Sequence, residues 1–288
     1  MRSEQQMIDL VLDFARKEKD IRVVLMNVSR VNPNVKRDVF QDFDIVYLVK
    51  EVDPYKRNQR VVSYFGDLII LQTPDDMNDP PPEDDGHYAY LMQFMDGNRI
   101  DLSFNSIDRL NDVLGDSLTL LLLDKDNIVE ELPPPSEADY LPKEHTDKLF
   151  QDCCNEFWWV SPYVAKGLWR EELTYAKYML DVAIREELMK MLTWYFGIKT
   201  GFKKSPGKLG KYIRNDVEPE LWLDLEKTYS DSNFDNIWES LFTMGSLFRR
   251  VANEVASVYG FKYPQGDDKN VTEYLWRIKN LPRDATEI

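Results

Sequence analysis

Cysteine and histidine are both scarce in this chain of 288 residues. The two cysteines, Cys153 and Cys154, are adjacent, and the two histidines are His87 and His145. Neighbouring positions on a helix point about 100° apart, so no structural disulfide is expected between the two cysteines. Two histidines are also a poor supply for a zinc site or a histidine-based catalytic triad. Any catalysis should therefore depend on carboxylates and lysines.

Long apolar runs are missing as well. No stretch approaches the roughly 18 apolar residues that a membrane-spanning helix needs. The first ten residues, MRSEQQMIDL, are too polar for the apolar region of a signal peptide. The sequence therefore predicts a cytoplasmic protein without a membrane partner.

Positive charge is in short supply. The chain has 36 Lys and Arg against 51 Asp and Glu, which gives a formal net charge of −15. Such a chain repels nucleic acid and anionic membranes, and its field favours cationic partners. We therefore expect no nucleic-acid partner. The charge either serves solubility alone or matches a cationic small-molecule substrate.

What is present indicates two domains and an α+β fold. Residues 1–130 mix strand and helix patterns and predict a domain with a mixed sheet. Residues 131–142 are acidic and proline-rich, as in a linker, and residues 143–288 carry the long helical patterns of a bundle. Ligand pockets often form between domains, so we expect the active site there.

The expected elements follow from periodicity and turn residues. In the first domain we expect helices at 5–17 and 106–114, and strands at 21–25, 42–49, 60–64, 68–72, 88–95, 99–104 and 118–123. In the second domain we expect helices at 145–167, 173–196, 218–229 and 235–259.

The most informative local pattern is Asp42-Phe43-Asp44. On a strand, side chains two residues apart share a face, so both carboxylates point the same way. Neighbouring carboxylates repel each other, and a bound Mg²⁺, which prefers oxygen ligands, removes that repulsion. The alternative is an ordinary half-exposed strand, because a single D-x-D is a weak motif.

A third carboxylate, Asp101, lies between Ile100 and Leu102 on another predicted strand. If that strand lies beside the Asp42 strand, three carboxylates converge and can hold the metal ions that bridge triphosphate oxygens. Asp101 is then a candidate general base for the attacking hydroxyl, either directly or as a metal ligand. A carboxylate of the helical domain is the alternative base.

Upstream, Ser29-Arg30 follows an apolar strand, and Ser29 precedes Asp42 by 13 positions. With the D-x-D and the later Asp, this arrangement resembles the nucleotidyltransferase superfamily. More closely, the chain resembles the aminoglycoside 6-adenylyltransferases (streptomycin adenylyltransferases). The segments that carry the likeness are FQDFDIVYLV (40–49), DGNRIDLSF (96–104), LLLDKD (121–126), CCNEFWWVSPYVAKGLWREEL (153–173) and GKLGK (207–211).

The resemblance implies transfer of AMP from ATP to a hydroxyl of streptomycin, the 6-hydroxyl, with release of pyrophosphate and antibiotic resistance as the outcome. It implies that Asp42, Asp44 and Asp101 bind Mg²⁺, and that Ser29 and Arg30 lie at the nucleotide. On the first long helix of the second domain, Lys166 would contact the triphosphate and Asn155 would face the cleft. A solvent-exposed lysine is the alternative for Lys166.

One residue departs from the family pattern. The superfamily has Gly directly before the Ser, whereas this chain has Val28. Glycine permits close backbone approach to phosphates and unusual backbone angles, and a β-branched valine does neither well. The alternative reading is therefore a non-catalytic relative that binds nucleotide or aminoglycoside. The acidic stretches Glu83–Asp85 and Glu171–Glu172 are candidate contacts for a polycation, or solvated surface.

Overall fold

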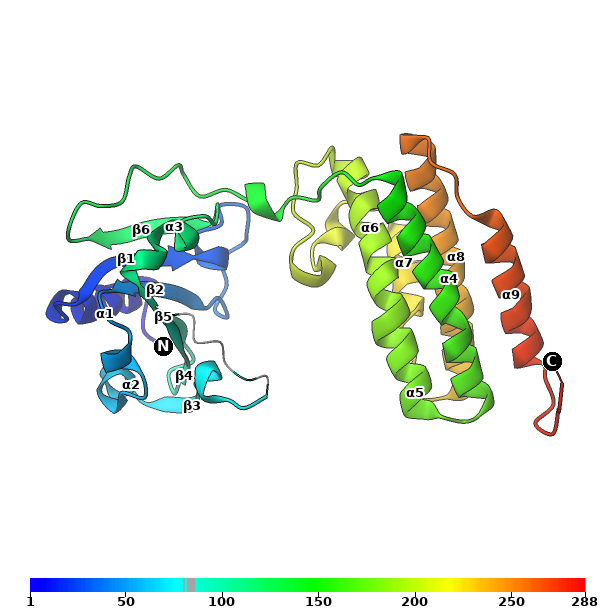
Figure 1. The fold of residues 1–288 in the computed structure, drawn as a ribbon, viewed down its shortest axis with the longest axis horizontal. Coiled ribbons are helices and arrows are strands. Elements are labelled where there is room, and N and C mark those ends of the chain that lie inside the picture. The colour runs from blue at the N-terminus through cyan, green and yellow to red at the C-terminus, as the bar shows by residue number, and fades with distance from the viewer. Residues whose placement is uncertain (80, 82–85, 288) are drawn as a thin grey trace. The chain divides into compact units, whose positions relative to one another are not determined.

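The computed structural model describes residues 1–79, 81 and 86–287, and the chain forms two compact units, Met1–Asp139 and Tyr140–Ile288. The acidic stretch 83–85 lies outside the described residues. The first unit combines a sheet with helices, and the second is helical (Figure 1). The predicted α+β fold is thereby confirmed.

The first unit is organised around a six-stranded mixed sheet with the order β3-β4-β5-β2-β1-β6 (Figure 1). Strands β2 and β5 run parallel, and the other neighbouring pairs run antiparallel. The strands are β1 (Ile21–Asn27), β2 (Phe43–Val49), β3 (Leu68–Gln72), β4 (His87–Phe94), β5 (Arg99–Ser106) and β6 (Thr119–Asp124).

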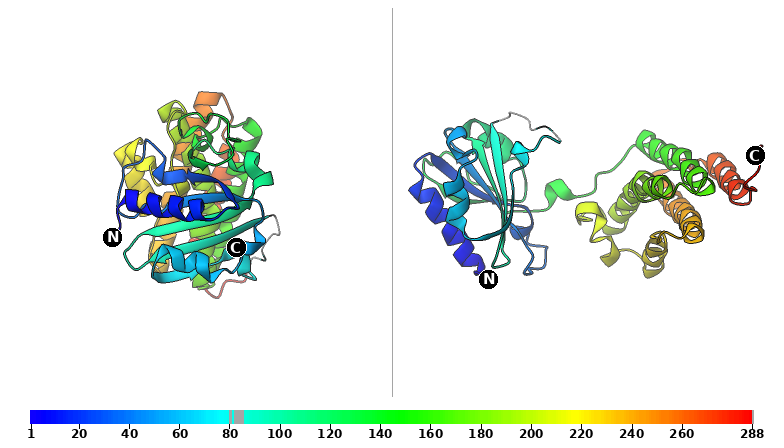
Figure 2. Two further views of the ribbon diagram at one scale, coloured as in Figure 1. Left: turned by 90° about the vertical axis from the view of Figure 1, so that its left-hand side faces the viewer. Right: turned by 90° about the horizontal axis from the view of Figure 1, so that it is seen from below.

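Two helices, α1 (Glu4–Lys17) and α2 (Gln59–Phe65), pack on one face of this sheet (Figure 2). Helix α1 begins at a capping box formed by Ser3 and Gln6. The opposite face has a smaller apolar cluster that includes Leu25, Val46 and Leu48, near the short helix α3 (Leu110–Val113). The end of the sheet beyond that cluster carries polar side chains instead.

The strand expected at 60–64 is wrong, because this segment is helix α2. The Asn58 side chain caps the helix by accepting a hydrogen bond from the Arg60 backbone N–H at 3.0 Å. Val61, Val62 and Phe65 then fall on one helical face and are buried against the core. The helix ends at Gly66, which has φ +121°. Valine by itself favours a strand, and tertiary burial overrode that preference here.

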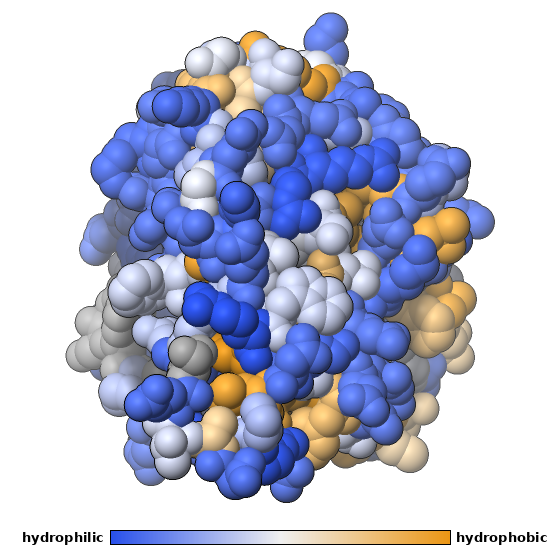
Figure 3. Space-filling model, turned by 90° about the vertical axis from the view of Figure 1, so that its right-hand side faces the viewer, coloured by the Kyte–Doolittle hydropathy of each residue, from blue (hydrophilic) through white to orange (hydrophobic). Residues whose placement is uncertain are grey.

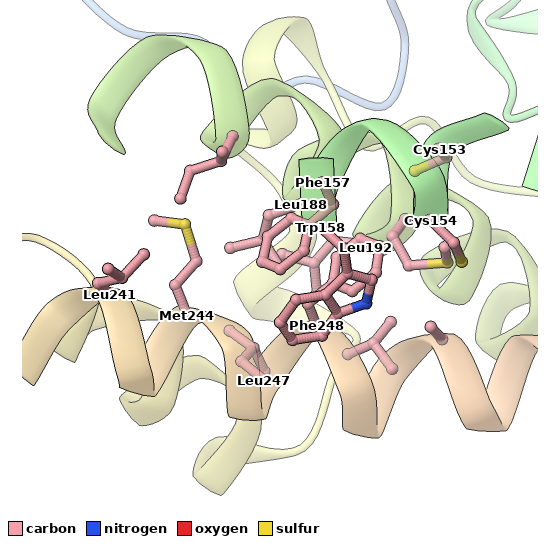
Figure 4. Close-up of a cluster of buried hydrophobic side chains, with 14 of the residues drawn as sticks. Cys153, Cys154, Phe157, Trp158, Leu188, Leu192, Leu241, Met244, Leu247 and Phe248 are labelled. Carbon is pink, nitrogen blue, oxygen red and sulfur yellow. The ribbon is translucent and has the colours of Figure 1, made fainter. Parts of the chain in front are cut away.

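The second unit is a helical bundle with an aromatic core (Figure 4). The rings of Phe157 and Phe248 are stacked 3.8 Å apart, and Cys153 and Cys154 are free and buried beside them. The expectation of no disulfide is thereby confirmed. The helices are α4 (Asp147–Trp169), α5 (Leu173–Tyr178), α6 (Arg185–Thr200), α7 (Pro219–Lys227), α8 (Phe234–Tyr259) and α9 (Gln265–Lys279).

Two features of the bundle differ from the expectations. The helix expected at 173–196 contains a π-helical segment, Met179–Ile184, and runs on to Thr200. Helix α9 was not expected, because few of its side chains are apolar; Leu275 and Ile278 are buried. It nevertheless packs along α4.

Across the described residues, no helix is long and apolar enough to cross a membrane. The face of the molecule in Figure 3 is mostly hydrophilic, and apolar side chains form only small patches on it.

Candidate active site

A row of polar side chains crosses one end of the sheet. Asp44 on β2 pairs in register with Asn27 on β1 and with Asp101 on β5, and Asn27 pairs in turn with Thr119 on β6. Paired residues of neighbouring strands point to the same face of a sheet. Asp44 therefore lies between Asn27 and Asp101, on the face opposite to Phe43.

Asp42 immediately precedes β2, one strand repeat before Asp44. A guanidinium group lies between it and Asp101. Arg99 donates from Nε and Nη2 to the two carboxylate oxygens of Asp101, each at 2.7 Å. Its Nη1 lies 3.6 Å from Oδ2 of Asp42. The structure therefore brings Asp42, Asp44 and Asp101 together, with an arginine among them.

The three carboxylates affect one another electrostatically. Burial, together with the nearby charges of Asp101 and Asp42, raises the pKa of Asp44 to about 6. Burial also raises the pKa of Asp42, while Arg99 opposes that shift. A half-buried group of like charges is the arrangement in which a cation stabilises most.

Buried polar atoms without hydrogen-bond partners gather at the same end of the sheet. Asn27 Oδ1, Thr119 Oγ1 and Gln41 Oε1 are buried and have no partner among the described residues. Buried polar groups in folded proteins are normally satisfied, so such atoms need an explanation. A polar ligand or an ion with its hydration shell supplies one.

The oxygen donors present fit a hard divalent cation in type. Carboxylate and amide oxygens, as in Asp42, Asp44 and Asn27, are the ligands that Mg²⁺ accepts. Over the described part of the chain, no group of three His, Cys, Asp or Glu side chains is arranged to hold a metal ion. In this arrangement the Arg99 guanidinium binds Asp101 and approaches Asp42.

A short 3-10 turn, Val28–Arg30, follows β1 and carries Ser29 to the edge of this row. Val28 has φ +61°, in the left-handed region, and the residue is 38% exposed. Its N–H donates to the Leu118 carbonyl at 2.9 Å, which helps to hold the turn. A β-branched residue is rarely found at such an angle, so the turn is strained at the position where the resemblance expects glycine.

Arg30 ties this turn to the strand that carries the carboxylates. Its buried guanidinium donates to the main-chain carbonyls of Gln41 and Asp42 at 2.5 and 3.2 Å, and it pairs with Glu4 at 3.1 Å. It also lies over the Phe43 ring, 3.7 Å from the centroid. These contacts fix the spacing between Ser29 and Asp42. A contact between Arg30 and nucleotide stays a prediction.

Comparison with known proteins identifies the family to which this chain belongs. A family model described as streptomycin adenylyltransferase matches residues 1–278. The chain belongs to this family. Family membership makes it an adenylyltransferase and confirms the resemblance seen in the sequence.

Several family members are similar over nearly their whole length. A protein named aminoglycoside 6-adenylyltransferase from Campylobacter jejuni is 40% identical over 280 residues, which cover 97% of this chain and 96% of the relative. A protein of the same name from Bacillus subtilis (strain 168) is 39% identical over 276 residues, covering 95% and 97%. A crystal structure of an aminoglycoside 6-adenyltransferase from Bacillus subtilis is 35% identical and covers 98% of this chain and 100% of that chain, with a TM-score of 0.48.

The family residues expected in the second unit lie on α4. Asn155 is exposed, and Lys166 is half-buried, with its Nζ 5.6 Å from the centroid of the Tyr163 ring. Trp158 is buried in the bundle core, whereas Trp159 is 65% exposed. Roles for Asn155 and Lys166 in nucleotide binding stay predictions.

Two residues of the site were missed in the sequence. Asn27 directly precedes the turn, at the end of an apolar strand, and a polar residue at a strand end was the available signal. Arg99 lies two positions before Asp101 on the same strand and therefore on the same face. That spacing was visible, and Arg99 lies within the segment 96–104 that carries the family likeness, but no role was assigned to it.

Proposed function

We propose that this chain transfers AMP from ATP to a hydroxyl of streptomycin, the 6-hydroxyl, and releases pyrophosphate. The observation that carries the proposal is the row of carboxylates, Asp42, Asp44 and Asp101, beside the Ser29 turn. The names of the similar family members support an aminoglycoside acceptor. The modified antibiotic would no longer act, so resistance is the proposed outcome, in the cytoplasm where ATP is available.

In the proposed reaction, the chain's own residues position charges around the α-phosphorus. Asp42 and Asp44, with Asp101, would hold Mg²⁺. When bound, Mg²⁺ neutralises charge on the triphosphate during in-line displacement. Ser29 would donate to a phosphate oxygen, and Arg30 would hold that turn at a fixed spacing. Lys166 and Asn155 are proposed as further nucleotide contacts from the helical domain.

The attacking hydroxyl must lose its proton during the displacement. Asp101 is the proposed base, with a carboxylate of the helical domain (143–288) as the alternative. The acceptor streptomycin carries guanidinium groups, which Asp and Glu side chains bind in a bidentate manner. The net charge of −15 favours such a cationic acceptor.

The test is incubation of the protein with ATP, Mg²⁺ and streptomycin, followed by detection of pyrophosphate and of adenylylated drug. Parallel reactions with other aminoglycosides, and with each component omitted, define the acceptor class. Pyrophosphate that depends on streptomycin supports the proposal. Binding of ATP or drug without pyrophosphate would instead favour the non-catalytic alternative raised by Val28.

A further inference from the structure

Arg99 lies among the carboxylates of the row and contacts two of them. It begins β5, two residues before Asp101, and its side chain is 38% exposed. Its fork binds both oxygens of Asp101 at 2.7 Å, and its third nitrogen lies 3.6 Å from Asp42. One guanidinium thus contacts two of the three side chains proposed as metal ligands.

The other arginine at this end of the sheet, Arg30, has its hydrogen-bond donors occupied by other partners. Arg30 binds main-chain carbonyls and Glu4, and its side chain is buried. Arg99 is therefore the cation that pairs directly with the cluster in the described structure. An arginine is always charged, and its planar fork matches a carboxylate geometrically. It supplies, within the protein, the positive charge that three neighbouring carboxylates require.

A divalent cation would need the same oxygens. An oxygen of Asp101 that accepts a hydrogen bond from the Arg99 fork offers its lone pairs less well to a metal, and the two positive charges repel each other. We propose that Arg99 is a positioning residue that competes with the divalent cation for Asp101 and Asp42. The proposal rests on the proposed function.

Competition between Arg99 and the metal ion affects the order in which metal and nucleotide bind. A guanidinium released from Asp101 matches a phosphate as well as it matches a carboxylate. Nucleotide therefore gives Arg99 a new partner, whereas metal alone does not. Arg99 therefore weakens metal binding in the absence of nucleotide, and bound nucleotide strengthens metal binding.

The experiment measures Mn²⁺ binding to the full-length protein, by electron paramagnetic resonance of free Mn²⁺, without any turnover. Arg99→Gln removes the competing charge and is expected to bind Mn²⁺ about three- to tenfold more tightly than wild type. Arg99→Lys keeps the charge but loses the fork, and should fall between the two. A non-hydrolysable ATP analogue should strengthen Mn²⁺ binding more in wild type than in Arg99→Gln.

A matched control lies at the other end of the sheet. Arg22 forms a similar fork with Asp126, with Nε to Oδ2 at 2.6 Å, far along β1 from the carboxylate row. Arg22→Gln should leave Mn²⁺ affinity unchanged. Circular dichroism establishes that each variant is folded. If Arg99→Gln does not fold, Arg99→Lys is compared with wild type alone and should bind Mn²⁺ more tightly than wild type.

Equal Mn²⁺ affinity in wild type and the Arg99 variants, weaker binding in Arg99→Gln, or no binding in any variant would overturn the inference. The proposed function is decided separately, by pyrophosphate release from wild type. A wild type that turns over with unchanged affinities in the variants keeps the function and loses the inference. Tighter Mn²⁺ binding in Arg99→Gln without turnover in wild type keeps the inference about Arg99 and rejects the proposed function.

Discussion

The two ends of β1 differ in how well their polar groups are satisfied. At the first end, Arg22 pairs with Asp126, and Lys125 donates to the carbonyls of Ala15 and Glu18 at 2.7 and 2.8 Å. At the other end, Asn27 Oδ1 has no partner in the described structure, and Val28 has φ +61°.

The difference separates what stabilises the fold from what prepares it for a ligand. Burial raises the pKa of Asp44 to about 6, which means that this end holds a carboxylate that the protein by itself stabilises poorly. Strain and unsatisfied groups persist only where the surrounding structure compensates for them, and they concentrate at functional sites. The unsatisfied end of β1 is also where the family resemblance places the nucleotide.

A substitution of Asp44, which pairs with Asn27 at the unsatisfied end of β1, should have the greatest effect on turnover. Asp44→Asn should lower kcat on the order of a thousandfold, because it removes a metal-binding charge. Its fold should persist, since the change removes a buried charge. Steady-state kinetics and circular dichroism check both points. Asp126→Asn, at the satisfied end, should leave kcat unchanged; near-normal turnover in Asp44→Asn would sink the metal assignment.

Arg30→Lys tests the tether between the turn and the carboxylates. Lysine cannot donate in the same fork to the carbonyls of Gln41 and Asp42, so we expect about a tenfold loss of kcat and a loss of about 1–3 kcal/mol in unfolding free energy. The exposed Arg37, whose Nη1 lies 3.6 Å from Glu4, gives the matched control Arg37→Lys, expected to be silent. A stability loss with unchanged kcat would show that the tether serves folding alone.

Val28→Gly should relieve the backbone strain at the unsatisfied end of β1. The left-handed angle costs a β-branched residue roughly 1–2 kcal/mol, partly offset because glycine gains entropy in the unfolded chain. We expect a KM for ATP that is several-fold lower, since glycine allows closer approach to phosphate. Val28→Ala, which retains a Cβ, should give little of this gain. An unchanged or higher KM for ATP would contradict the prediction.

The smallest effect concerns pH. The folded pKa of Asp44, about 6, is raised from its ordinary value of 3.8. The metal-free fold therefore binds a proton more readily than the unfolded chain between these values. Protonated Asp44 therefore contributes to the free energy of unfolding. This contribution is full below pH 3.8 and is lost as the pH rises through about 6. Urea unfolding in the presence of EDTA should show this slope in wild type and not in Asp44→Asn.

Much of the fold could be predicted because it follows local periodicity. The alternation around Asp42 and Asp44 predicted a strand at 42–49, and the structure has β2 there, with Val46 and Leu48 buried. The helices of the second unit follow their apolar stripes in the same way. Prediction failed where burial overrode local preference, as at α2, and where the apolar signal was weak, as at α9.

The sequence alone sets which side chains share a face of each strand or helix, because the backbone repeats of 2 and 3.6 residues are fixed locally. It thereby determined that Asp42 and Asp44 point the same way. Only the tertiary structure decided that β5 runs beside β2 in a register that sets Asp101 opposite Asp44. It also decided that the Arg99 guanidinium approaches Asp42 and that Arg30 ties the turn to Gln41 and Asp42. These depend on pairing between segments distant in the chain, which no local pattern specifies.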